Sequence, residues 1–309
     1  MKDFKFGFEI ETCVKLLNLK EELPLYAVYA KISEFFKKQI GEEVKVESED
    51  YSLWSIVLDA SVECPKTILV PKPKSCLSKN GLSKEDCGET KFYPIEIISP
   101  IFSPTIQTME KIKMVLFKFF FNDNLVFALN ESQGFHIHIS HPLLDKTALA
   151  KLWCVFEEEI FNLLALERKG NKYTKSLRCS FLDNEYRDEE EFKTFVKSPK
   201  NIFSNIDYTM TDYKPLFPID RYHSLNLSIE DSTHVEFRLF GATLIFQDIY
   251  KYLKFCLNFV FFSIKNKRKE NSFYDSLNGL TTDQKLIFVN DNFIKNNEIL
   301  GPVQKVRNI

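Results

Sequence analysis

Residues 7–11 read GFEIE and place two glutamates inside an otherwise hydrophobic strand pattern. Successive side chains of a strand point to opposite faces, so the hydrophobic residues share one face while Glu9 and Glu11 share the other. We therefore expect a strand over residues 4–12 that has a core-facing side and an acidic side.

Three later stretches show the same division into an apolar and a polar face: SLWSIVLDASVE (52–63), GFHIHIS (134–140) and HVEFRL (234–239). A further strand pattern, YPIEIIS (93–99), places Glu96 among isoleucines, where a carboxylate without a partner is costly. The polar faces of the first three stretches carry Asp59, Ser61, Glu63, His136, His138, His234, Glu236 and Arg238.

Two interpretations of this polar face are open. Antiparallel sheets commonly have one solvated side, whose charges then simply face water. The alternative is a metal site, because crowded carboxylates raise one another's pKa unless a cation offsets their charge. The combination of several such strands favours the metal site. Carboxylate oxygens with one histidine favour Mg²⁺ or Mn²⁺, whereas Zn²⁺ prefers more histidine or cysteine ligands.

The stretch RYHSLNL (221–227) adds a cation and an amide to these strands. Arg221 beside a carboxylate cluster is suited to clamp a phosphate or a carboxylate, and Asn226 follows on the same strand. The remaining histidines are more often structural, and we expect this of His141, His223 and His234.

The order of expected elements indicates an α+β fold. Strands and helices are mixed without a strict βαβ alternation, and residues 221–229 and 233–240 read as a hairpin, so we expect a largely antiparallel sheet. Helices are expected at 24–39, 104–122, 144–166, 246–266 and, shorter, at 281–290.

The chain is expected to form one catalytic domain over residues 1–266, followed by a C-terminal extension over 267–309. Two irregular, polar stretches interrupt this domain as insertions at about 67–91 and 168–218. Short helices are expected within the second insertion, at 189–197 and 200–206.

Composition excludes some classes of partner. The 41 lysines and arginines nearly balance the 43 aspartates and glutamates, which argues against binding to nucleic acid or to an anionic membrane. The longest apolar tract, residues 244–264, contains Asp248, Lys251 and Lys254 and is typical of an amphipathic helix packed on a core.

The seven cysteines form no CxxC pair, and their number is odd. The first residues lack the apolar run of a signal peptide. We therefore expect a cytoplasmic protein with free thiols and without a zinc–cysteine site.

Taken in order, FGFEIE, the Trp54–Asp59–Ser61 stretch, EIISP, GFHIHIS, RYHSLNL and EFRLF resemble the motifs of the amidoligases. These are carboxylate–amine ligases related to glutamine synthetase and glutamate–cysteine ligase, and the resemblance covers about residues 4–264. It implies a curved, largely antiparallel sheet of the glutamine-synthetase type, with helices packed on its apolar face.

The resemblance also implies roles for individual residues. Arg238 and Arg221 would contact the transferred phosphate, and His138 would lie near the nucleotide. Asp59, Ser61 and Asn226 would line the substrate side, with Asp59 or Glu63 helping to deprotonate the incoming ammonium group. Two or three Mg²⁺ ions would be held by Glu9, Glu11, Glu96, His136 and Glu236.

The activity that the resemblance implies is an ATP-dependent ligation that joins a carboxylate to an amine through an acyl phosphate. The two substrates are small molecules, peptides or protein side chains. The same residues leave two alternatives open: a metal-dependent hydrolase or phosphoesterase, and an inactive binding module on the same scaffold.

Overall fold

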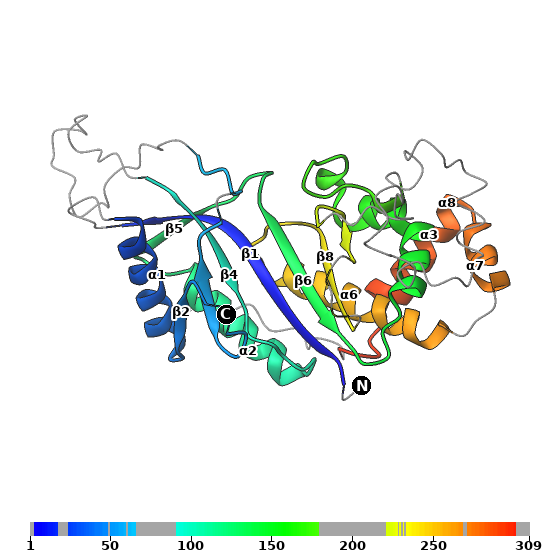
Figure 1. The fold of residues 1–309 in the computed structure, drawn as a ribbon, viewed down its shortest axis with the longest axis horizontal. Helices are drawn as coiled ribbons and strands as arrows, with labels where there is room; N and C mark the ends of the chain where they lie inside the picture. Colours follow the sequence, from blue (N-terminus) through cyan, green and yellow to red (C-terminus); the bar gives the residue numbers. More distant parts are fainter. Residues whose placement is uncertain are drawn as a thin grey trace, which may run out of the picture. The chain divides into compact units, whose positions relative to one another are not determined.

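The computed structural model describes residues 3–17, 24–48, 50–59, 61–65, 91–178, 221–227, 229, 231, 233–267 and 271–300. Most of the two predicted insertions, including the short helices expected at 189–197 and 200–206, lies outside these residues. The chain divides into two compact units (Figure 1). Unit 1 consists of Met1–Phe8, Ile101–Lys111 and Gly134–Ile309, and unit 2 of Glu9–Pro100 and Ile112–Gln133.

Two elements contribute residues to both units. Strand β1 (Lys5–Leu16) begins in unit 1 and continues in unit 2, and helix α2 (Ile106–Phe120) does the same. The predicted division into one catalytic domain and a C-terminal extension stays a prediction.

Unit 2 is built on a small sheet in which β4 is central. Strand β4 (Tyr93–Ile98) pairs antiparallel with β1 and with β3 (Trp54–Val57). Strand β2 (Val44–Val46) runs parallel to β3, and β5 (Leu125–Ala128) runs antiparallel to β1. Glu96 therefore occupies the middle strand of this sheet.

Helix α1 (Leu25–Ile40) covers the β2 and β3 side of unit 2. It begins directly after Pro24, which is suited to a first turn, and ends at Gly41, whose positive φ of 74° is easy for glycine. Its buried Phe36 packs edge-on against Trp54, with ring centroids 5.4 Å apart, and against Phe119 at 4.1 Å. The helix thus fixes β3 from its hydrophobic side.

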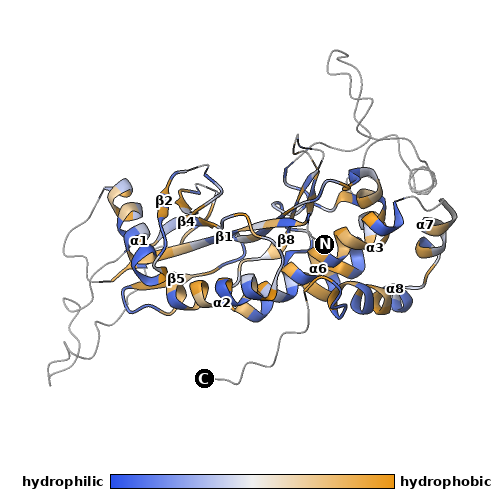
Figure 2. Ribbon diagram, turned by 90° about the horizontal axis from the view of Figure 1, so that it is seen from below, coloured by the Kyte–Doolittle hydropathy of each residue, from blue (hydrophilic) through white to orange (hydrophobic). Residues whose placement is uncertain are grey.

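Unit 1 packs long helices on an antiparallel set of strands. Strand β8 (His234–Gly241) pairs with β6 (Gly134–Ser140) and with the short β7 (Leu225–Asn226). Helices α3 (Lys146–Leu164) and α6 (Phe246–Asn266) contact these strands and each other, and each carries hydrophobic and hydrophilic residues (Figure 2).

The core of unit 1 is rich in aromatic rings. Trp153 of α3 lies 5.6 Å from Phe237 of β8 and 5.4 Å from Phe259 of α6, measured between ring centroids. Edge-to-face contacts of this kind stabilise a core beyond the area that they bury. The remaining helices of the described part of unit 1 are the 3₁₀ helix Leu166–Arg168, α7 (Asn271–Asn278), α8 (Thr282–Val289) and the π-helix Asn290–Ile294.

The predicted fold class is confirmed: the chain is α+β, and its strand pairing is mostly antiparallel. The helix expected at 246–266 is α6 with the same bounds. The alternation in β1 is confirmed as far as Ile10, whereas every residue from Glu11 to Leu16 is buried. A local signal sets the beginning of α8, where Thr281 and Gln284 exchange the hydrogen bonds of a capping box.

One predicted strand is wrong in its second half. Residues 52–63 alternate like a strand, but β3 ends at Val57, and Leu58 is exposed rather than buried. The reason is the carboxylate of Asp59, which accepts hydrogen bonds from the backbone N–H and the hydroxyl of Ser61 at 2.8 and 2.6 Å. Such local side-chain bonds compete with a sheet ladder and favour a turn. The short strands β2 and β5 and helix α7 were not predicted.

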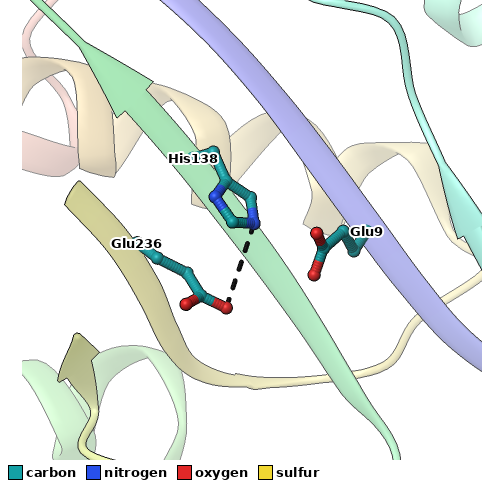
Figure 3. Close-up of side chains that lie close together, drawn as sticks. All are labelled: Glu9, His138 and Glu236. Carbon is teal, nitrogen blue, oxygen red and sulfur yellow. Dashed lines mark ion pairs between the residues drawn. The ribbon is translucent and has the colours of Figure 1, made fainter. Parts of the chain in front are cut away.

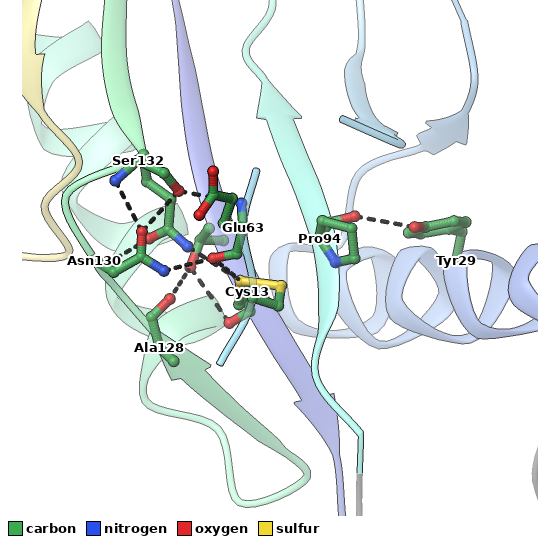
Figure 4. The surroundings of a disulfide bond; sticks show 10 residues. Cys13, Tyr29, Glu63, Pro94, Ala128, Asn130 and Ser132 are labelled. Carbon is green, nitrogen blue, oxygen red and sulfur yellow. Dashed lines mark hydrogen bonds between the residues drawn. A yellow bond between two sulfur atoms is a disulfide. The ribbon is translucent and has the colours of Figure 1, made fainter. Parts of the chain in front are cut away.

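The prediction of free thiols is wrong for two cysteines. Cys13 and Cys64 form a disulfide, with Cα atoms 5.6 Å apart (Figure 4). The count and spacing of cysteines carry no information on this pair, because the segment after β3 must first fold back onto β1. Cys154 and Cys256 are buried thiols. No helix in the described ranges combines the length and the apolar character that crossing a bilayer requires.

Candidate functional site

The predicted site residues come from both units of the chain. The unit 2 cluster lies on β1, β4 and the turn after β3, and it consists of Glu9, Glu11, Asp59, Ser61 and Glu96. The unit 1 cluster lies on β6, β7 and β8, and it consists of His136, His138, Asn226, Glu236 and Arg238.

The register of the sheet assembles the unit 2 cluster. Glu11 of β1 lies directly opposite Glu96 of β4, and the neighbouring strand β3 ends beside Glu96 and leads to Asp59. Glu11, Asp59 and Glu96 each offer a carboxylate oxygen within 4.8 Å of the others. These three residues come from three separate segments, so their meeting is a property of the sheet.

Electrostatic repulsion within this cluster is visible in the pKa of Glu96. This pKa is raised from the ordinary 4.5 to about 10, mainly by burial and in addition by the charges of Glu9, Glu11 and Asp59 and by a hydrogen bond with Glu9. In the metal-free protein Glu96 is therefore protonated at neutral pH, and its hydroxyl donates to Glu9. A bound divalent cation would offset the negative charge of these carboxylates in place of the proton. The residues therefore fit a metal site.

The kind of metal follows from the donor atoms. Carboxylate oxygens are hard ligands, and clusters of them favour Mg²⁺ or Mn²⁺ over softer ions. Ser61 contributes indirectly, because its backbone N–H and hydroxyl hold one oxygen of Asp59. Its predicted contact with substrate stays a prediction.

The unit 1 cluster is organised around Glu236, which is 4% exposed. One of its oxygens accepts a hydrogen bond from the Asn226 amide at 2.6 Å, and the other accepts one from the Arg238 guanidinium at 2.6 Å. Such charge-assisted hydrogen bonds are short and strong. Glu236 is thus held in one position by groups of the protein itself.

Two histidines of β6 approach the same oxygen of Glu236. His136 Nδ1 lies 3.7 Å and His138 Nε2 lies 3.9 Å from this oxygen; Figure 3 shows the second pair. A register shift between β6 and β8 sets Arg238 and Leu239 opposite His136, as in a β-bulge. Bulges re-aim side chains near functional sites, and here both histidines turn toward one carboxylate.

A second histidine pair was not predicted. His138 Nδ1 and His234 Nε2 lie 3.1 Å apart, within hydrogen-bonding distance. Burial, together with the charge of His138, lowers the pKa of His234 to about 4, so His234 is neutral at pH 7. The alternation in HVEFRL places His234 on the same face as Glu236, and this is the signal in the sequence that points to the pair.

Arg221 is exposed, and its guanidinium carbon lies 5.8 Å from the ring centroid of Tyr222. Its predicted phosphate contact stays a prediction.

Glu157 of α3 is 2% exposed and was missed by sequence reasoning, because an acidic run on a helix gives no hint of burial. It accepts hydrogen bonds from Trp153, Ser176, Leu177, Arg178 and Ser224.

The hydrogen bonds of Glu157 explain its role. They join α3 to residues 176–178, near the start of the second predicted insertion, and to Ser224, which comes immediately before β7. Glu157 therefore fixes the start of β7, whose Asn226 in turn holds Glu236.

Comparison with known proteins adds one match. A family model with the description "Putative amidoligase enzyme" matches residues 2–260. The search among curated proteins found no match.

Proposed function

The chain belongs to the amidoligase family, and on this premise we propose that it is an ATP- and Mg²⁺-dependent ligase. It joins a carboxylate to an amine through an acyl phosphate, and its sheet is of the glutamine-synthetase type. The observation that carries the proposal is the group of Glu11, Asp59 and Glu96, whose carboxylates lie within 4.8 Å of one another.

The proposed metal ligands come from both clusters. Glu9, Glu11 and Glu96 of unit 2, and His136 and Glu236 of unit 1, are the proposed metal ligands. Bound Mg²⁺ would offset the negative charges of the ATP phosphates and of the attacking carboxylate. The raised pKa of Glu96 supports this assignment, because it shows a place where negative charge is crowded.

Arg238 and His138 act on the nucleotide. Glu236 orients the guanidinium of Arg238 through a 2.6 Å hydrogen bond, so the side chain is arranged before a phosphoryl group arrives. Nδ1 of His138 lies within hydrogen-bonding distance of His234 Nε2, and this contact fixes the orientation of the His138 imidazole. Arg221, which is exposed, would contact phosphate or substrate from the surface.

Asp59 acts on the amine. An incoming ammonium group must lose a proton before its nitrogen can attack the acyl phosphate, and a neighbouring carboxylate is a suitable acceptor. Ser61 fixes one oxygen of Asp59, so the carboxylate is oriented in advance. Ser61 and Asn226 are the further proposed substrate contacts.

Nucleotide binding tests the proposal without knowledge of the substrates. A non-hydrolysable ATP analogue with Mg²⁺ is expected to raise the melting temperature of the wild type, since a ligand at 100 times its Kd adds about 2.7 kcal/mol of stability. Glu11→Gln is expected to lose the Mg²⁺-dependent part of this shift. Glu34→Gln, an exposed glutamate of the same unit, is the control. A wild type without any Mg²⁺-dependent shift contradicts the proposal.

Release of inorganic phosphate then separates the ligase from a phosphohydrolase. With ATP and Mg²⁺, release is expected only when a carboxylate and an amine are both supplied. Release without an amine identifies the alternative hydrolase.

A further inference from the structure

The Cys13–Cys64 disulfide joins β1 to the segment that carries Asp59. We propose that this disulfide is a thiol–disulfide exchange site that sets the position of Asp59 relative to Glu11 and Glu96, so that reduction weakens metal binding by this group. The inference rests on the proposed function, because it concerns the same metal cluster, to which it adds Asp59 as a third carboxylate beside the proposed ligands Glu11 and Glu96.

Both ends of the disulfide are close in sequence to the cluster. Cys13 follows Glu11 on the same face of β1, and Cys64 ends the segment that begins with Asp59. Between them, Val62 is buried with Cys13 and Phe92 in a small hydrophobic cluster. The disulfide is therefore a covalent tie between one metal-site strand and the turn that brings in the third carboxylate.

A neighbouring turn holds the same segment by hydrogen bonds (Figure 4). The backbone N–H of Glu63 donates to the Ser132 hydroxyl at 3.1 Å, and the Asn130 amide donates to the Glu63 carbonyl at 2.5 Å. The Ser132 hydroxyl in turn donates to Asn130 at 2.7 Å. These bonds and the buried Val62 keep the segment near β1 when the disulfide opens, but with more freedom than the covalent tie allows.

The two sulfur atoms differ in their surroundings. Cys13 is fully buried, whereas Cys64 is partly exposed, so an external thiolate reaches Cys64 first. The Gln133 amide donates a hydrogen bond to Cys13 Sγ at 3.1 Å, and its oxygen accepts one from the Asn130 N–H at 3.0 Å, which fixes the orientation of the amide. This donor stabilises negative charge on Cys13, which makes it the better leaving group.

The exchange is a two-electron reduction by a dithiol. One thiolate of the dithiol attacks Cys64 Sγ, and the disulfide bond breaks with its electron pair going to Cys13, which takes up a proton. The second thiol of the dithiol, after losing its proton, attacks the mixed disulfide. Cys64 then leaves as a thiolate and is protonated, and the dithiol is released as a disulfide.

Metal titration of the full chain tests the proposal. Mn²⁺ binding is measured by electron paramagnetic resonance on oxidised protein and on protein reduced with dithiothreitol and desalted without oxygen. Reduction is expected to weaken binding about tenfold, the lower end of what loss of a positioning contact costs a metal site. Alkylation and mass spectrometry verify that Cys13 and Cys64 carry free thiols.

Two variants and one control test whether reduction acts on metal binding through the disulfide and Asp59. Cys64→Ser is expected to bind like the reduced wild type under both conditions. Asp59→Asn is expected to bind weakly in both states and to lose the response to reduction, because its side chain no longer offers a charged oxygen. Cys256→Ala, which removes a buried free thiol, is expected to respond like the wild type.

The outcomes separate this inference from the proposed function. Equal Mn²⁺ affinity in the oxidised and the verified reduced protein overturns the switch and leaves the metal site intact. A response to reduction that persists in Asp59→Asn overturns the assigned route. Absence of Mn²⁺ binding in both states overturns the metal site and the switch together. Amide exchange of residues 61–64 adds a metal-independent measurement, and it must rise on reduction.

Discussion

Glu96 in unit 2 and Glu236 in unit 1 are carboxylates on the middle strand of their clusters, but their neighbours are of opposite character. Carboxylates surround Glu96, and together with burial they raise its pKa to about 10. Glu236 accepts hydrogen bonds from Asn226 and Arg238.

The difference teaches that one fold can use the same side chain in two ways. Glu236 is a fixed anion that belongs to the stability of unit 1, because its partners are supplied by β7 and β8. Glu96 is a neutral acid in the metal-free protein, and we propose that a bound cation replaces its proton. Removing Glu236 is therefore expected to cost mainly stability, whereas removing Glu96 is expected to affect mainly metal binding.

The largest expected effect is that of Glu236→Ala on stability. It leaves the buried guanidinium of Arg238 without its carboxylate, which typically costs about 3 to 5 kcal/mol. Denaturant unfolding measures this loss. Glu110→Ala, an exposed glutamate of unit 1, is expected to stay within about 0.5 kcal/mol of the wild type. If Glu236→Ala lowers the free energy of unfolding no more than Glu110→Ala does, the ion pair contributes little to stability.

Glu96→Gln is expected to affect metal binding most. The amide keeps the shape of the protonated acid but cannot become an anion, so Mn²⁺ affinity should fall by about 100-fold, the upper end of what loss of a partner around a metal costs. Calorimetric titration measures the affinity, with Glu34→Gln as the exposed control in the same unit. Unchanged affinity in Glu96→Gln removes Glu96 from the ligands.

The proton on Glu96 predicts a pH dependence. Its folded-state pKa of about 10 lies above the ordinary 4.5, so the metal-free native state holds a proton that the unfolded chain releases in this window. Stability without metal should therefore be highest below pH 4.5 for this group and fall as pH rises toward 10, by at most about 1.4 kcal/mol per pH unit.

Metal affinity has the opposite slope. Because Glu96 must lose its proton to bind, affinity should rise with pH by up to about tenfold per unit. Calorimetric metal titrations in buffers of different ionisation enthalpy should detect the release of about one proton when the cluster binds metal at pH 7. Both slopes should vanish in Glu96→Gln, and slopes that persist there belong to another group.

The smallest expected effect is that of His234→Ala, which removes the partner of His138 at 3.1 Å. Loss of one hydrogen bond of this kind costs about 1 kcal/mol of stability. A ¹H–¹⁵N spectrum of the ring nitrogens should show a changed tautomer of His138. His234→Gln keeps a polar group and should recover part of the wild-type spectrum. An unchanged spectrum in His234→Ala shows that His138 is oriented by other groups.

Local patterns predicted much of this molecule. The bounds of α6 followed from a helical repeat of apolar residues, and the buried and acidic faces of β1 followed from strict alternation. The same alternation failed after Val57, because the Asp59 carboxylate makes bonds to Ser61 that a pattern of hydrophobicity does not contain. The buried Glu157 failed for a similar reason, since its donors come from distant parts of the chain.

The sequence by itself determined the α+β class, the residue types of the candidate metal site and the family, because these depend on composition, on period and on the order of motifs. The tertiary structure decided which groups meet. The register of β1 and β4 set Glu11 opposite Glu96, the return of the segment after β3 paired Cys13 with Cys64, and strand pairing brought His138 to His234. Contacts of this kind join residues that are far apart along the chain, and their pKa values, hydrogen bonds and covalent bonds exist only once the chain has folded.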